Sequence, residues 1–322
     1  MRRPRRGRGK AMQSWLVSLT GWGTEVILWI QGFRTPWLDV LFKALSGLGT
    51  TYAYLVLLPL VYWCFDRLAG IGLAYVVLLS GWLNAGLKNL FAIPRPSDPR
   101  IMRLEEIGDP SFPSGHAQNA MAVWGYLAGR ARRAGFWVLA ALLILGIGFS
   151  RLYLGVHYPQ DVLAGYLVGA LFLLVFAPAE KYLTRLVGPL TMGAQMVLAL
   201  AVPALVWLGS WALGMPEGQG DVSPAVVAGA LFGLNLGIVL EGRFVRFSPA
   251  GPALQRAGRF LLGLLLVFAF YLGPRWLAQQ VLPAAYESAP VRLARYFLVA
   301  LVVSWIGPWL FVKVGLARRR SR

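Results

Sequence analysis

The stretch SFPSGHA, residues 111–117, opens an apolar run and contains one of the two histidines of the 322-residue chain. Pro113 and Ser114 are typical of a helix start, because a serine hydroxyl can accept hydrogen bonds from the free amides of the first turn. Gly115 lets the backbone approach a ligand closely, and the free amides of a helix N-terminus favour an anion. His116 adds a side chain suited to proton transfer. The stretch therefore indicates either an anion site with an acid–base group or a capped transmembrane helix with an interfacial histidine.

The second histidine favours the anion site. His157 lies in the segment SRLYLGVHYPQD, residues 150–161. Asp161 follows it by four residues, which is one turn if the backbone there is helical. The carboxylate could then orient one ring nitrogen and leave the other free to attack. This pair predicts a nucleophile with its orienting acid.

Basic residues complete the pattern. The segment KNLFAIPRP, residues 88–96, contributes Lys88 near the end of an apolar run and Arg95 in the loop that follows. A lysine inside a membrane segment is costly and usually functional. Arg151 lies six residues before the second histidine. The three segments together supply cations for a phosphate, two histidines, a carboxylate and a helix start, which is a composition suited to phosphoryl transfer.

These three segments resemble the signature of the phosphatidic acid phosphatase type 2 superfamily: K-x6-RP, then PSGH, then SR-x5-H-x3-D. The chain carries all three in order, with the internal spacings intact, over residues 88–161. The resemblance implies that His157 attacks phosphorus and forms a phosphohistidine, that Asp161 orients it, and that His116 protonates the leaving alkoxide and then activates water. The implied phosphate-binding residues are Lys88, Arg95, Ser114, Gly115 and Arg151.

The composition indicates a polytopic membrane protein. The chain is 57% hydrophobic and 14% charged, with a mean hydropathy of +0.61, whereas soluble domains carry about 25% charged residues. The net charge of +18 comes from basic residues at helix ends and tails, a pattern typical of membrane topology rather than of nucleic-acid binding. Cys64, as the single cysteine, cannot form an internal disulfide.

The apolar runs predict an all-α fold, with a six-helix lipid phosphatase core followed by about four additional transmembrane helices, because a span needs about 20 apolar residues. The first run contains Glu25 and several glycines, so an interfacial helix is the alternative there. The predicted spans cover residues 14–31, 50–65, 69–91, 116–128, 134–149, 159–177, 191–213, 222–240, 260–282 and 293–314. We divide the chain into a basic cytoplasmic tail (1–13), the phosphatase core (14–180), and the additional helices with a basic tail (181–322).

Loop charges predict the orientation. With ten spans, the excess of Lys and Arg places both termini in the cytoplasm and the three motifs on the outer face. If the first run does not span, the later assignments reverse and the cytoplasmic loops become poorer in positive charge. The Arg-, Ala-, Leu- and Gly-rich usage suggests a bacterial inner membrane.

The expected substrate is an amphiphile with a phosphate head, such as phosphatidic acid, lysophosphatidic acid, a sphingoid-base phosphate, phosphatidylglycerol phosphate or polyprenyl pyrophosphate. The chain is similar in length to the sphingosine-phosphate phosphatase branch. A phosphotransferase using the same intermediate and a lipid transporter or flippase with a relic site are the alternatives. The soluble haloperoxidases of the superfamily do not fit the composition.

We expect no metal and no cofactor, because three cations can neutralise a phosphate and two histidines with one cysteine are too few for an obvious metal cluster. The loop acids could in principle hold a divalent ion, but solvated or gating charges are the preferred interpretation. These acids are Asp98, Glu105, Glu106 and Asp109. The expected partners are the lipid phosphate and the bilayer; the oligomeric state is left open.

Overall fold

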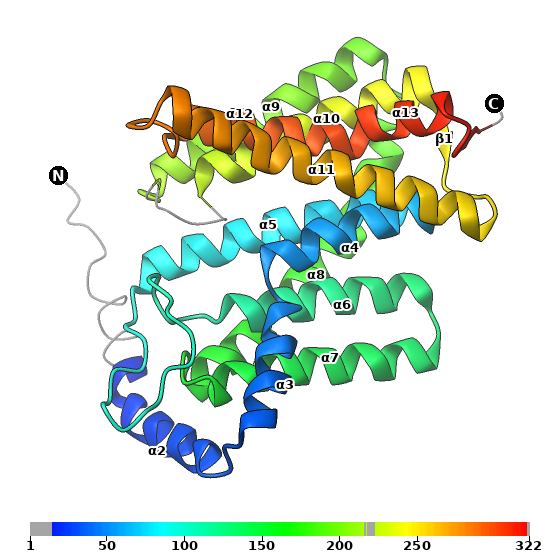
Figure 1. Cartoon of the computed structure of the whole chain (residues 1–322). Helices are drawn as coiled ribbons and strands as arrows, with labels where there is room; N and C mark the ends of the chain where they lie inside the picture. The colour runs from blue at the N-terminus through cyan, green and yellow to red at the C-terminus, as the bar shows by residue number, and fades with distance from the viewer. Residues whose placement is uncertain (1–14, 216, 218–222, 321–322) are drawn as a thin grey trace. The chain divides into compact units, whose positions relative to one another are not determined.

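The computed structural model describes residues 15–215, 217 and 223–320. The described chain is almost entirely helical (Figure 1). The helices of the first half are α2 (Thr20–Gln31), α3 (Pro36–Gly47), α4 (Thr51–Cys64), α5 (Arg67–Phe91), α6 (Gly115–Ala131), α7 (Ala134–Tyr153) and α8 (Pro159–Val187). The second half contains α9 (Met192–Ala212), α10 (Pro224–Leu240), η1 (Glu241–Val245), α11 (Ala253–Val281), α12 (Ala289–Leu301), η2 (Val302–Ile306) and α13 (Gly307–Lys313). Two short strands, β1 (Phe247–Ser248) and β2 (Arg318–Arg319), pair antiparallel, with Phe247 opposite Arg319.

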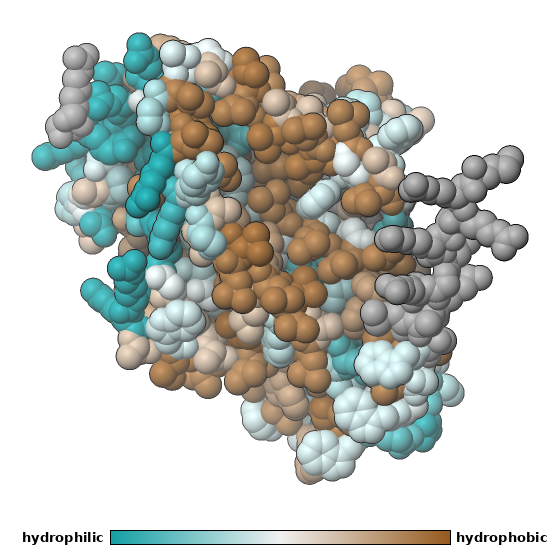
Figure 2. Space-filling model, turned by 180° about the vertical axis from the view of Figure 1, so that it is seen from behind, coloured by the Kyte–Doolittle hydropathy of each residue, from teal (hydrophilic) through white to brown (hydrophobic). Residues whose placement is uncertain are grey.

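The prediction of a polytopic all-α membrane protein is confirmed. Within the described residues, seven helices are long and apolar enough to cross a membrane, and eight if the bent pair α3 and α4 counts as one span. Leucines along α8 and α9 are exposed, for example Leu174 and Leu205, and apolar side chains cover much of the surface seen in Figure 2. Exposed apolar surface on this scale is what a lipid environment requires.

Three of the ten predicted spans correspond to short or bent helices in the structure. The first run forms helical residues 15–18, a turn at Leu19 and then α2, which has 12 residues. The second predicted span, α4, has 14 residues and continues from α3 through a bend of 55°. The fourth, α6, has 17 residues, which is the lower end of the length range of a span. The interruption at Leu19 fits the interfacial alternative for α2, and the cytoplasmic N-terminus stays a prediction.

The chain divides into two compact units. The first unit contains residues Met1–Ala53 and Leu83–Phe176, and α6 and α7 lie side by side in it. The start of α8 approaches the start of α6 very closely, because Gly165 has no side chain: a Cβ there would lie 2.6 Å from the Ser114 carbonyl oxygen. Ile27 of α2 packs with Tyr158 just before α8. These contacts fix the segments that carry the predicted motifs.

The second unit contains residues Tyr54–Trp82 and Ala177–Arg322. Its core includes Trp63 and Cys64 from α4 together with residues of α10 to α13. Along α10, Gly229, Gly233 and Gly237 each face the backbone or side chain of α12 or η2 where a Cβ would clash. Small residues at every fourth position let two helices approach closely, as is common between transmembrane helices.

Candidate active site

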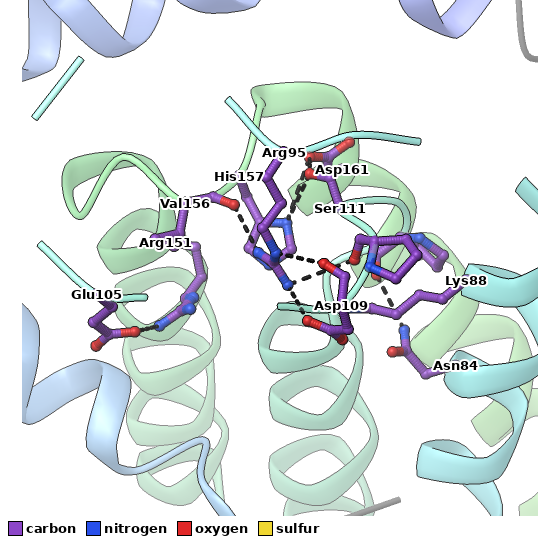
Figure 3. A network of polar contacts seen from close by, with 12 residues as sticks. Asn84, Lys88, Arg95, Glu105, Asp109, Ser111, Arg151, Val156, His157 and Asp161 are labelled. Atoms are coloured by element: carbon purple, nitrogen blue, oxygen red, sulfur yellow. Dashed lines mark hydrogen bonds and ion pairs between the residues drawn. The ribbon is translucent and has the colours of Figure 1, made fainter. Parts of the chain in front are cut away.

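The three predicted motifs meet in the first unit. The residues labelled in Figure 3 come from the end of α5, the loop of residues 92–114, the end of α7, the segment 154–158 and the start of α8. The loop is tied down by backbone hydrogen bonds, including one of 2.7 Å from the Ser111 amide to the Ile93 carbonyl. Residues far apart in the sequence are therefore held at fixed positions.

Lys88 and Arg95 share one acidic partner. The Lys88 ammonium contacts Asp109 Oδ2, and Arg95 Nη2 donates to Asp109 Oδ1 at 2.6 Å. Arg95 Nε also donates to the Asp109 carbonyl oxygen at 2.7 Å. The side chains of Lys88 and Arg95 are only 9% and 8% exposed, whereas that of Asp109 is 51% exposed. The buried cations Lys88 and Arg95 thus bind a carboxylate that is half exposed to solvent.

Arg95 connects this cation pair to the second histidine. Its Nη1 donates to the Val156 carbonyl oxygen at 2.7 Å and lies 3.1 Å from His157 Nε2. The other ring nitrogen, Nδ1, lies 3.4 Å from Asp161 Oδ2. With the proton on Nδ1, facing the carboxylate, the lone pair of Nε2 points to the side where the cations lie. This is the orientation that an attacking imidazole requires.

Ser111 stands between His157 and Asp161. Its hydroxyl donates to Asp161 Oδ2 and lies 3.3 Å from His157 Nδ1. The same carboxylate oxygen accepts the Tyr158 amide at 2.9 Å. The carboxylate is therefore held by several donors and cannot rotate freely, so the ring of His157 is held as well.

Arg151 has its own acidic partner. It is fully buried, and Nη1 donates to Glu105 Oε2 at 2.8 Å and to the Ser46 hydroxyl. Nε and Nη2 of the same guanidinium are buried and have no hydrogen-bond partner among the described residues. Buried donors without a partner are costly, so this group is suited to receive the oxygens of an incoming anion.

The helix start at residues 114–116 is confirmed, but its expected cap is absent. Ser114 is the N-cap of α6, in extended conformation, and its side chain makes no capping hydrogen bond. The backbone amide of Ser114 donates to the Asp161 carbonyl oxygen at 3.0 Å, which the close approach of α8 brings within reach. Ser114 Oγ and His116 Nε2 are buried without a hydrogen-bond partner in the described part of the chain. Gly115 gives room to Asn84, whose Oδ1 would lie 2.9 Å from a Cβ there.

Burial and charge together set the titration of the groups outside the membrane helices. Burial, and after it the charges of Arg95 and Lys88, hold the pKa of His157 well below its usual range, so the ring is neutral at neutral pH. Burial alone would raise the pKa of Asp109, but the two cations outweigh it and lower that pKa below its ordinary value. A neutral nucleophile thus stands beside a charged ion-pair network.

The sequence did not indicate the roles of Ser111, Asp109, Glu105 and Ser46. The two acids were taken as solvated or gating charges, and only the fold shows which cations they contact. Asn84 Nδ2 of α5 donates to Gln118 Oε1 of α6 at 2.9 Å, which is an interhelical hydrogen bond. Among the described residues, no group of three or more His, Cys, Asp or Glu side chains is placed to hold a metal ion.

The helical membrane fold and the basic, histidine-containing site define a class, the integral-membrane phosphatases. Residues 69–185 match the family model of the PAP2 superfamily, and residues 225–319 match that of the PAP2 superfamily phosphatase transmembrane extension. The chain belongs to the PAP2 superfamily, and it is a phosphoric monoester hydrolase.

The relatives with similar sequences are named as lipid phosphate phosphatases. Lipid phosphate phosphatase delta of Arabidopsis thaliana is 25% identical over 317 residues, which cover 88% of this chain and 74% of that protein. Sphingosine-1-phosphate phosphatase 2 of Homo sapiens is 30% identical over 151 residues, 44% of this chain and 38% of its own length. A solved PAP2-type phosphatidylglycerolphosphate phosphatase from Bacillus subtilis is 23% identical, with a TM-score of 0.45, over 52% of this chain and 89% of that one.

Proposed function

We propose that this protein hydrolyses the phosphomonoester head group of a membrane lipid through a phosphohistidine on His157, without a metal ion. The observation that supports this most directly is the position of His157, with Nε2 3.1 Å from Arg95 Nη1 and Nδ1 3.4 Å from Asp161. A neutral imidazole oriented by a carboxylate and pointing its lone pair at a cation cluster is suited to attack a bound phosphate.

In the first step, His157 Nε2 attacks phosphorus in line, the N–P bond forms and the bond from phosphorus to the lipid oxygen breaks. Asp161 stabilises the positive charge that develops on the ring. In its protonated form, His116 gives its proton to the leaving alkoxide. In the second step His116 takes a proton from water, the hydroxide oxygen bonds to phosphorus, and the N–P bond breaks to release inorganic phosphate.

The cations take the part that a metal ion plays in other phosphoryl-transfer sites. Lys88, Arg95 and Arg151 would neutralise the non-bridging oxygens. Ser114 Oγ and two Arg151 nitrogens are buried donors that lack partners in the described structure. The amides around Ser114, Gly115 and His116 add further donors at the start of α6. These groups would neutralise the negative charge of the phosphate without a bound ion.

The substrate class that we propose is a single-chain or double-chain lipid phosphate, with sphingoid-base phosphates first. The names of several relatives point to this class, and the match to the transmembrane extension over residues 225–319 extends the similarity beyond the catalytic segments. The exposed leucines of α8, such as Leu171 and Leu174, support a lipid environment around the first unit, where such a substrate is dissolved.

We further propose that the catalytic end of the first unit faces the outer side of the membrane. The opposite ends of α6 and α7 carry Arg130, Arg132 and Arg133, and such a basic cluster favours the cytoplasm. This argument uses one helix pair and does not depend on whether α2 spans. The assignment to a bacterial inner membrane remains a prediction based on amino-acid usage. A cysteine introduced in the Arg130–Arg133 turn should resist an impermeant thiol reagent in intact cells.

The direct test is release of phosphate from a panel of lipid phosphates by the purified protein in detergent, with and without EDTA. We expect release that EDTA does not change, inhibition by vanadate, which mimics pentacoordinate phosphorus, and no release by His157→Ala. Loss of activity with EDTA would refute the metal-free mechanism, and appreciable activity of His157→Ala would refute the nucleophile. Transfer of phosphate to a lipid, with no free phosphate, would instead identify a phosphotransferase.

A further inference from the structure

The carboxylate of Asp109 lies where the proposed function places the substrate's phosphate. One of its oxygens contacts the ammonium of Lys88 and the other accepts Arg95 Nη2 at 2.6 Å (Figure 3). A carboxylate bridging two cations has the geometry and charge of two phosphate oxygens. A phosphate that binds to Lys88 and Arg95 must therefore displace the Asp109 side chain.

The displaced carboxylate stays close to the phosphate. The Asp109 carbonyl oxygen is held by Arg95 Nε at 2.7 Å, so the backbone remains beside the cations while the half-exposed side chain turns away. Displacement removes both ion pairs from a carboxylate that they keep charged. A negative group then stands next to a bound phosphate, and the two repel unless a positive charge lies between them.

One kind of lipid phosphate brings that positive charge with it. In an amino-alkyl phosphate, the ammonium lies on the carbon next to the one that carries the phosphate ester. The phosphate of such a head group replaces the carboxylate on Lys88 and Arg95, and its ammonium replaces the two cations on the carboxylate. Lys88 and Arg95 then keep an anionic partner and Asp109 keeps a cationic one, whereas a head group without an ammonium leaves Asp109 without a cation.

We propose that Asp109 is a specificity-determining residue that selects lipid phosphates with a free ammonium beside the phosphate ester, by exchanging its ion pairs with Lys88 and Arg95 for one with the substrate. This inference rests on the proposed function and narrows its substrate class. Glu105 does not have this position, because it contacts Arg151 and Ser46 and its side chain is only 29% exposed.

The test is a cycle of two protein variants and two substrates. The substrates are a sphingoid-base phosphate and its N-acetyl derivative, which lacks the positive charge. The kcat/KM ratio between them is measured in detergent micelles for the full chain and for Asp109→Asn. The added bulk of the acetyl group affects both proteins alike, so the ratio of the two ratios isolates the interaction of Asp109 with the charge.

We expect the preference for the free amine to fall about tenfold or more in Asp109→Asn, as for the loss of one partner of a charged pair. The N-acetyl substrate should be hydrolysed at least as well as by the wild type, since no carboxylate competes for Lys88 and Arg95. Asp109→Glu, which keeps the charge, should retain most of the preference. The matched control is Glu106→Gln, an exposed acid of the same loop, which should leave the ratio unchanged.

An unchanged ratio in an active Asp109→Asn enzyme would overturn the proposal. An equal loss on both substrates would overturn it too, because Asp109 would then merely position the two cations. If Asp109→Asn does not fold, the ratio is measured with Asp109→Ala, which also removes the carboxylate, and an unchanged preference for the free amine in that variant would again count against selection. Failure of the proposed function is a different result: the wild type would release no phosphate from any lipid.

Discussion

Replacement of Ser111 by alanine tests how much its hydroxyl contributes to holding Asp161 and His157 in position. Ser111 is fully buried, and its hydroxyl donates to Asp161 and lies 3.3 Å from His157 Nδ1. Its removal deletes one hydrogen bond to a charged group, a loss of about 1.5–3 kcal/mol. If most of this loss appears in the transition state, where the ring becomes positive, kcat falls about 10- to 100-fold. KM should change little, because Ser111 does not contact the cations proposed to bind phosphate.

The assay is steady-state phosphate release over a range of substrate concentrations in mixed micelles, with the melting temperature recorded for each variant. Ser210→Ala is the matched control. Ser210 is equally buried, accepts Trp82 Nε1 at 2.7 Å and donates to the Val206 carbonyl oxygen, all within the second unit. That variant should lose stability and keep kcat. A Ser111→Ala enzyme with kcat within about twofold of wild type, or with only KM changed, would refute the reasoning.

Three further predictions concern charge, pH and packing. Arg151→Gln should lower kcat/KM by at least about tenfold, because it removes a buried cation. An unchanged kcat/KM in this variant would exclude Arg151 from the phosphate site. Because the pKa of His157 is held well below its usual range, the ring stays unprotonated as the pH falls, and the acidic limb of kcat/KM should lie clearly below pH ~6.5; a midpoint at or above that pH would contradict a neutral, buried nucleophile. Gly233→Val should destabilise the protein by about 1–3 kcal/mol, since a side chain there meets the Phe297 carbonyl of α12; an unchanged melting temperature would mean that α10 and α12 pack less closely than described.

Patterns with strong local signals could be predicted from the sequence. Long apolar runs gave the positions of α5 and α7 to α12 to within a few residues of most ends. The fixed spacings of Lys88, Arg95, His157 and Asp161 indicated a common site, and the structure brings these four side chains into one network. Their catalytic roles remain predictions that the variants above would test.

Features that depend on tertiary partners could not be predicted. The acids of the loop look alike in sequence, yet Asp109 contacts Lys88 and Arg95 whereas Glu105 contacts Arg151, and only the path of the loop decides this. The hydroxyl of Ser114 was expected to cap α6, but it makes no capping hydrogen bond. The first apolar run was long enough in composition to suggest a span, but a turn at Leu19 interrupts its helix.

The discontinuous second unit imposes an order on biosynthesis. Trp63 Nε1 donates to the Val303 carbonyl oxygen at 2.9 Å, and Arg67 Nε donates to Glu241 at 2.6 Å. The ribosome makes Trp63 and Arg67 long before either partner. Until then, Trp63 of α4 and Arg67 at the start of α5 lack these hydrogen-bond partners. The nascent first unit can pack once residue 176 has emerged, while the second closes only with the last helices. Chains that terminate early would expose those two side chains to quality control.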